Sequence, residues 1–219
     1  MVNEIGLKKI WQTTNEKLEE NIVINRKNSA NITKLKVHHF LSSMKPIKIF
    51  TLLIGILWVG IGIIALGGIY LYAFSEANKF FLFSATMQVL LTAIALIIYI
   101  YQLITIYQVN ITEPILKTQK KLANLKISTL WVTRILFLQL PIWTTFYWNA
   151  SMLENGNWLL WLFQGIVTLS FSFVATWLFF NIKYKNKDKK WFQLIFNGKE
   201  WTPLMKAMKL SEQIEEYKK

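Results

Sequence analysis

Four long stretches without a charged residue constrain the fold of this chain more than any other feature. No Asp, Glu, Lys or Arg occurs within residues 49–75, 80–112, 135–153 or 155–182. A helix needs about 20 predominantly apolar residues to cross the hydrocarbon core of a bilayer, and the third stretch is close to that minimum. We therefore predict four transmembrane helices, at Ile49–Phe74, Phe80–Tyr107, Thr129–Trp148 and Trp158–Asn181.

The composition supports this assignment. Of the 219 residues, 53% are hydrophobic and 15% aromatic, which exceeds what the core of a small globular domain needs. The predicted fold class is all-α: an integral membrane protein with four transmembrane helices, plus amphipathic cytosolic helices at both ends and in the middle loop. The predicted segments are an N-terminal helical segment (1–46), a first transmembrane hairpin (47–107), a cytosolic amphipathic connector (108–128), a second transmembrane hairpin (129–182) and a C-terminal segment (183–219).

Lys and Arg fall almost entirely on one side of the predicted membrane. Nine precede the first span, five lie within 117–134, ten lie from residue 183 onward, and only Lys79 falls in the two short loops opposite. Because cytoplasmic loops carry an excess of Lys and Arg, we expect both termini and the middle loop in the cytosol. The net charge of +13 then follows from topology, so nucleic acid is not a predicted partner.

No catalytic or metal-binding pattern is present in the sequence. The absence of cysteine excludes disulfides, thiol catalysis and cysteine-ligated metals. His38 and His39 are adjacent, so on a helix they point about 100° apart and do not easily share a metal. We expect no enzymatic activity, no cofactor and no metal.

The predicted spans contain uncharged polar residues and paired glycines. Interhelical hydrogen bonds are the expected use of the polar residues Gln88, Thr92, Gln102, Gln139, Gln164, Thr168 and Thr176. The spans contain no Asp or Glu, which disfavours a pump or coupled transporter. Gly55 and Gly62 share one helix face, as do Gly60 and Gly67, and both pairs indicate close helix packing.

Two further residues of the third span have structural interpretations. Arg134 lies near the cytosolic end of the span, where its long side chain can reach the interface, and we predict a structural role for it. Pro141 removes a backbone hydrogen bond to Phe137 and is expected to kink the helix.

The opening stretch predicts an amphipathic helix with an unusual mixture of charges. One face of this helix contains Leu7, Ile10, Trp11, Thr14, Leu18 and Ile22 at spacings of three and four residues, and Leu7, Ile10, Trp11 and Leu18 are the candidate docking residues of this apolar stripe. The stripe could cover the membrane surface, other cytosolic segments of this chain or a partner protein. Membrane-surface helices favour Lys and Arg on their polar face. The acids Glu16, Glu19 and Glu20 therefore favour docking to a protein.

The other cytosolic segments also predict helices. One is expected from Asn28 to Met44, ending before Pro46, and another begins after Pro114 in the middle loop. In the C-terminal segment, Asn197 and Gly198 either end a short helix or turn a hairpin, and we favour the helix end. A last helix is expected to start near Thr202.

Three stretches carry a resemblance to a known group of proteins: "LKKIWQTTNEKLEEN", "TEPILKTQKKLANLK" and "LQLPIWTTFYW". Together they resemble small bacterial four-span membrane proteins encoded beside extracytoplasmic-function sigma factors and regarded as candidate anti-sigma or signalling proteins. The resemblance implies a bacterial cytoplasmic (inner) membrane location and a sigma factor as partner. It supplies no functional residues to map, and the chain lacks the His and Cys pattern of zinc-type anti-sigma domains.

Three functional hypotheses follow. The first is a membrane regulatory or signalling protein that docks a cytosolic partner through Leu7, Ile10, Trp11 and Leu18. The second is an accessory subunit of a transporter or channel, with the glutamines of the spans along a pathway. The third is a structural membrane scaffold. The lipid bilayer is a partner in all three, and a homo-oligomer stays open.

Overall fold

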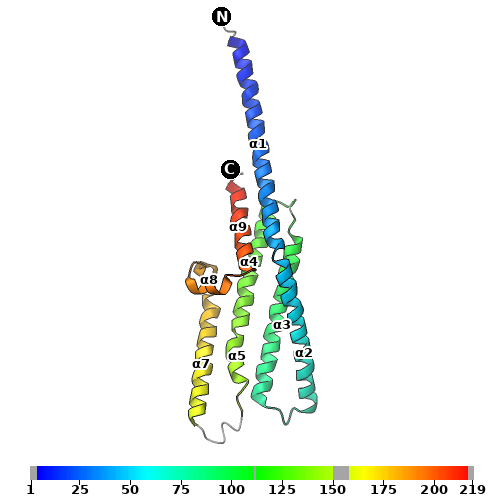
Figure 1. The fold of residues 1–219 in the computed structure, drawn as a ribbon, viewed down its shortest axis with the longest axis vertical. Coiled ribbons are helices and arrows are strands. Elements are labelled where there is room, and N and C mark those ends of the chain that lie inside the picture. The colour runs from blue at the N-terminus through cyan, green and yellow to red at the C-terminus, as the bar shows by residue number, and fades with distance from the viewer. Residues whose placement is uncertain (1–3, 111, 150–157, 217–219) are drawn as a thin grey trace.

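The chain folds into helices that run up and down along one long axis (Figure 1). The computed structural model describes residues 4–110, 112–149 and 158–216, and these contain helices and no strand. The helices are α1 (Glu4–Ser42), α2 (Lys45–Tyr72), α3 (Lys79–Gln108), α4 (Ile115–Phe137), α5 (Gln139–Thr145), α7 (Trp158–Asn181), the 3₁₀ helix η1 (Tyr184–Asn186), α8 (Lys190–Phe196) and α9 (Trp201–Glu216).

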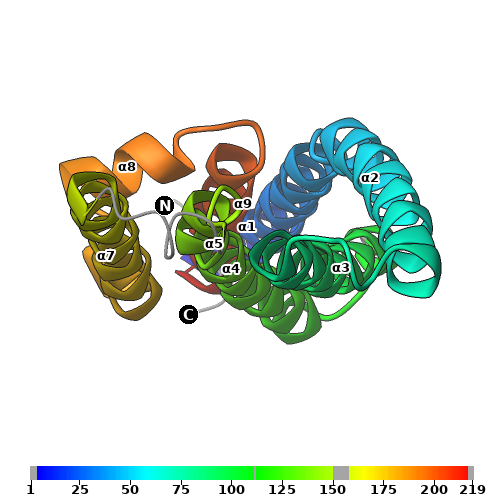
Figure 2. The same ribbon diagram turned by 90° about the horizontal axis from the view of Figure 1, so that it is seen from below.

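The apolar helices stand in a row (Figure 2). α3 contacts α2 on one side and α4 and α5 on the other, and α7 contacts α4 and α5 at the far end. Within the described residues, four helical stretches are long and apolar enough to cross a membrane: Lys8–Tyr72, Lys79–Gln108, Leu116–Thr145 and Trp158–Asn181. The predicted all-α class with four helices of this kind is therefore confirmed. The bilayer, the orientation and the amphipathic character of the cytosolic helices stay predictions.

The N-terminal segment differs from the prediction of two separate helices. α1 runs without interruption from Glu4 to Ser42. No Gly or Pro occurs between Leu7 and Pro46, so nothing in the backbone chemistry forces a break. The expected end before Pro46 does occur, and Pro46 occupies the first turn of α2, where its missing N–H is not needed.

The third predicted span is broken near Pro141. α4 ends at Phe137 and α5 begins at Gln139, with Leu138 between them. Pro141 has no N–H to donate to the carbonyl of Phe137, which accounts for the interruption. α4 also passes through residues 128 and 129 without interruption, so the connector and the following span share one helix.

The C-terminal segment contains a helix end and a helix start where both were expected. α8 ends at Phe196, and the N–H of Asn197 caps it by donating to the carbonyl of Gln193 at 2.7 Å. α9 then begins at Trp201, one residue before the predicted start. The helix-end interpretation of Asn197 and Gly198 is therefore confirmed, and the hairpin is not observed.

The two glycine pairs of α2 behave differently. A Cβ added to Gly62 would lie 2.6 Å from Cγ2 of Val89 on α3, and one added to Gly55 would collide with Leu96. This face of α2 is packed closely on α3, as predicted. A Cβ added to Gly60 or Gly67 would meet no described atom within 4 Å, so close packing at that second face is not observed among the described residues.

Polar side chains join the apolar helices at several levels, as expected. Gln139 Nε2 on α5 donates to Thr92 Oγ1 on α3 at 2.9 Å. Gln164 Nε2 on α7 donates to the carbonyl of Thr144 on α5 at 2.6 Å. In a region without water such bonds satisfy groups that would otherwise be costly to bury. They hold α3, α5 and α7 in register.

Candidate functional site

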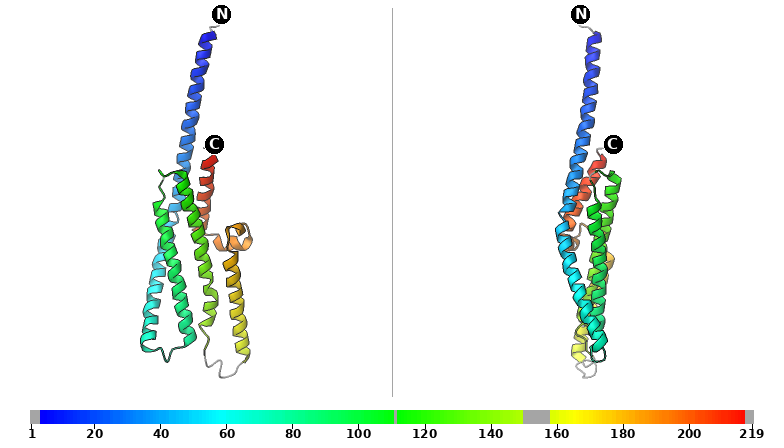
Figure 3. Two further views of the ribbon diagram at one scale, coloured as in Figure 1. Left: turned by 180° about the vertical axis from the view of Figure 1, so that it is seen from behind. Right: turned by 90° about the vertical axis from the view of Figure 1, so that its right-hand side faces the viewer.

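The first half of α1 extends away from the rest of the molecule (Figures 1 and 3). Every residue from 8 to 28 is exposed, and we refer to this stretch as the arm. At 1.5 Å per residue the arm is about 30 Å long. The arm extends parallel to the axes of the apolar helices and beyond their ends, so its tip lies far from them (Figure 3).

The predicted docking residues lie on the arm and are uncovered. Ile10, Trp11 and Leu18 have 66%, 73% and 54% of their area exposed. Leu7 belongs to the backbone of α1, and its side chain lies outside the described residues. The structure places none of the three described side chains against another described helix. Packing of the stripe on this chain's own cytosolic segments is therefore not observed.

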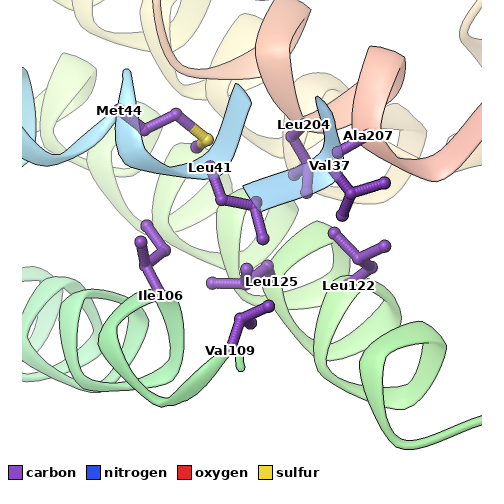
Figure 4. Packing of buried hydrophobic residues seen from close by; sticks show 9 residues of the cluster. All are labelled: Val37, Leu41, Met44, Ile106, Val109, Leu122, Leu125, Leu204 and Ala207. Atoms are coloured by element: carbon purple, nitrogen blue, oxygen red, sulfur yellow. The ribbon is translucent and has the colours of Figure 1, made fainter. Parts of the chain in front are cut away.

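Residues 29–44, the second half of α1 and the short turn after it, are the root that fixes the arm to the protein. Val37 and Leu41 are four residues apart, so they share one helix face, and Met44 follows in the turn. At most 2% of the area of each of these three residues is exposed. Their cluster is completed by residues of α3, α4 and α9 and by Val109 after α3 (Figure 4). The other members are Ile106, Val109, Leu122, Leu125, Leu204 and Ala207.

A charged cluster lies beside this root, at the start of α2. Lys48 is fully buried, and its Nζ donates to Gln102 Oε1 at 2.6 Å and to Glu200 Oε2 at 2.9 Å. The ammonium also lies 4.4 Å from the centre of the Tyr99 ring. The Tyr99 hydroxyl donates to the Glu200 carboxylate at 3.2 Å. We refer to these four residues as the Lys48 cluster.

The electrostatics of the cluster depend on burial. Burial lowers the pKa of Lys48 from its usual range, and the Glu200 carboxylate acts in the opposite direction by favouring the charged ammonium. Because the local dielectric is low, a paired ammonium is tolerated here while an unpaired one would be costly. Gln102 Nε2 is buried and has no hydrogen-bond partner among the described residues.

The cluster connects two distant parts of the chain. Glu200 immediately precedes α9, and α9 packs on both the root of α1 and on α4. The Lys48–Glu200 ion pair therefore fixes the beginning of α9 against the beginning of α2. Sequence reasoning counted Lys48 only as the last cation before the first span and did not single out Glu200. Only Gln102, a polar residue in the next predicted span, indicated in the sequence that Lys48 could have a polar partner.

Arg134 supports the other end of the row. Its guanidinium donates to the carbonyl of Ile182, just after α7, with Nε at 2.8 Å. That carbonyl lies at a helix end, where backbone oxygens need outside donors. The contact agrees with the structural role predicted for Arg134.

The described residues contain no group of three or more His, Cys, Asp or Glu side chains that could hold a metal ion. His38 is half-buried and His39 exposed on the root of α1. Comparison with protein-family models, with curated proteins and with solved structures finds no match to this chain. The exposed arm and the root that holds it are therefore the features that indicate a function.

Proposed function

We propose that this protein is an integral membrane regulatory or signalling protein that docks a cytosolic protein through the arm of α1. The observation that carries the proposal is the contrast between the two halves of this helix. The root is packed on α9 and α3 and shares one buried cluster with residues of α4, while the arm exposes Ile10, Trp11 and Leu18 to solvent. A helix fixed at one end and uncovered at the other is suited to present a binding face.

The direction of the arm favours a protein partner over the membrane surface. α1 is uninterrupted and extends beyond the ends of the apolar helices along the long axis of the molecule (Figure 3). To lie on a bilayer that contains the row, the arm would have to bend sharply within a helix that has no Gly or Pro there. The acids Glu16, Glu19 and Glu20 also oppose contact with anionic headgroups.

The physical chemistry of an isolated helix supports the same proposal. The described side chains of the arm make no tertiary contact that would stabilise it, and in proteins most of the stability of a helix comes from packing of its apolar face. A partner that covers the stripe would stabilise the arm and bury Trp11, the largest apolar group on it. Buried aromatic anchors commonly contribute about 2 kcal/mol or more to an interface. The resemblance to proteins encoded beside sigma factors makes a sigma factor the first partner to test.

A transport subunit would place its glutamines along one pathway. Three glutamines of this chain instead form hydrogen bonds at three different contacts between helices. Gln102 bonds Lys48, Gln139 bonds Thr92, and Gln164 bonds the Thr144 carbonyl. These contacts join helices, and no observation in the described part of the chain favours transport.

The test uses a photo-activated crosslinker at position 11 of the full chain in cells, followed by identification of the captured protein. Trp11→Ala, assayed from a crosslinker at position 14, is expected to lower capture by roughly tenfold or more, because it removes the main apolar anchor. Membrane insertion and abundance should stay unchanged, since Trp11 touches no other described element.

The matched control is Val23→Ala. Val23 lies on the same arm, is 64% exposed and points about 120° away from Trp11 around the helix. It should capture the partner as the wild type does. Equal capture by Trp11→Ala and wild type contradicts the proposal. Capture of a second copy of this chain and of no other protein would contradict docking of a cytosolic protein and would mean that the arm forms a homo-oligomer.

A further inference from the structure

A groove lies between the turn that follows α7 and the side of α9. Its volume is about 580 Å³. Three cations line it together with polar side chains that can donate hydrogen bonds. These lining residues are Tyr184, Lys187, Gln193, Thr202, Lys206 and Lys209. We refer to it as the basic groove.

The charges of the basic groove are available to a ligand. Asp188 and Glu212 also line it, yet Lys187, Lys206 and Lys209 form no ion pair with any described carboxylate. All three lysines are exposed. Lys187 Nζ lies 3.4 Å from the hydroxyl of Tyr184, a weak contact that a stronger acceptor could replace.

The surrounding chain adds more positive charge. Residues 183–199, which follow α7 and include α8, contain six lysines and one acid, Asp188. These are Lys183, Lys185, Lys187, Lys189, Lys190 and Lys199. They begin directly after the apolar helix α7, where a cluster of this size is typical of contact with anionic lipids.

The short helix α8 indicates where the groove lies relative to a bilayer. α8 runs across the end of α7 rather than along it (Figures 1 and 3). Leu194 on α8 is 85% exposed, and Trp191 packs edge-on against Trp177 of α7 at 5.0 Å between ring centres. Tryptophan and exposed leucine at the end of a transmembrane helix favour the level where headgroups meet acyl chains.

We propose that the basic groove binds the phosphate of an anionic phospholipid, held by the ammonium groups of Lys187, Lys206 and Lys209. Thr202 and Gln193 supply further donors. A lipid is the occupant rather than a soluble phosphate because Trp201, Met205 and Met208 line the groove beside the cations, and a lipid has acyl chains to cover this apolar surface. This inference rests on α7 lying in a bilayer and is independent of docking at the arm.

The experiment uses the full chain in nanodiscs of phosphatidylcholine with a minor fraction of phosphatidylglycerol. Native mass spectrometry after release from the nanodiscs measures the ratio of the two lipids retained by the protein. The wild type should be enriched in phosphatidylglycerol. The triple variant K187Q/K206Q/K209Q should lose that enrichment, with binding of phosphatidylglycerol weakened roughly a hundredfold, since each lysine near an anionic surface contributes about fivefold to binding.

The matched control is K8Q/K9Q/K17Q, which removes the same charge from the arm and should retain phosphatidylglycerol like the wild type. Lys206→Gln alone should give an intermediate loss, and this single exposed substitution guards against misfolding of the triple variant. The proposal is overturned if both groove variants retain phosphatidylglycerol like the wild type. It is also overturned if the arm control loses as much phosphatidylglycerol as the triple variant. Displacement of phosphatidylglycerol by millimolar inorganic phosphate would identify a soluble anion as the ligand and also overturn it.

Discussion

The Lys48 cluster allows a prediction in which the two partners of one ion pair respond unequally. Replacing Glu200 by Gln removes the negative charge that pairs with the ammonium of Lys48, in a site with no exposed area. Only neutral groups then remain beside the ammonium: Gln102 Oε1, the Tyr99 ring and the amide at position 200. Replacing Lys48 by Met leaves a carboxylate whose side chain is 22% exposed and still accepts from Tyr99. Water can therefore compensate the second change more readily than the first.

The magnitudes follow from this asymmetry. Breaking a buried ion pair by removing one partner costs about 3–5 kcal/mol, and the partial exposure of Glu200 puts Glu200→Gln near 3. Lys48→Met should cost about 1–2 kcal/mol, the usual result of removing a hydrogen bond to a charged group that water can reach. The double variant K48M/E200Q should lose less than the two singles together, because apolar replacement of a buried pair is often nearly neutral.

The assay is denaturant unfolding in detergent micelles, followed by tryptophan fluorescence. A second readout is trypsin cleavage after Lys199, which is exposed beside Glu200. Cleavage should accelerate most in Glu200→Gln. Glu16→Gln, which makes the same charge change on the arm, is the control. The reasoning is refuted if Glu200→Gln unfolds like this control, or if the losses of the two single variants add in the double variant.

Two further predictions concern packing and topology. Gly62→Ala should destabilise the protein in the same unfolding assay, because the added Cβ would lie 2.6 Å from a side chain of α3. Gly60→Ala should be neutral or slightly stabilising, since no described atom lies within 4 Å of the added Cβ. Equal effects of the two variants would contradict close packing of α2 on α3. Reporter proteins fused after Lys219 or inserted within residues 118–124 should both report a cytosolic location, as the distribution of Lys and Arg requires. A signal from the opposite side of the membrane at either point would disprove the four-span topology.

Several local features could be predicted from residues alone because their causes are local. Proline cannot donate a backbone hydrogen bond, so it is tolerated only in the first turn of a helix; a helix accordingly ends before Pro46, which starts the next one, and another breaks near Pro141. The spacing of Gly55 and Gly62 predicted a packed face because seven residues return to the same side of a helix. The same argument could not tell that Gly60 and Gly67 face no neighbour, since spacing does not say which face is covered.

The candidate site was predictable in part for the same reason. The stripe of Ile10, Trp11 and Leu18 follows from helical periodicity, but whether the chain's own segments cover it is a tertiary question. The prediction of a second helix that starts at Asn28 was wrong, because α1 continues through Asn28 and Ser29 without a break. These residues are only mildly unfavourable inside a helix, and the packed root of α1 compensates for them.

The sequence by itself determined the all-α class with four long apolar helices, because long apolar runs without charge are typical of helices that satisfy their own backbone groups. The distribution of Lys and Arg likewise determined the predicted orientation. Only the tertiary structure decided which polar groups meet. Lys48 and Glu200 stand 152 positions apart, and nothing in the spacing of either predicts the other. Their pairing depends on how α9 returns to the root of α1, and that return is set by side-chain packing among distant helices, which no local pattern encodes.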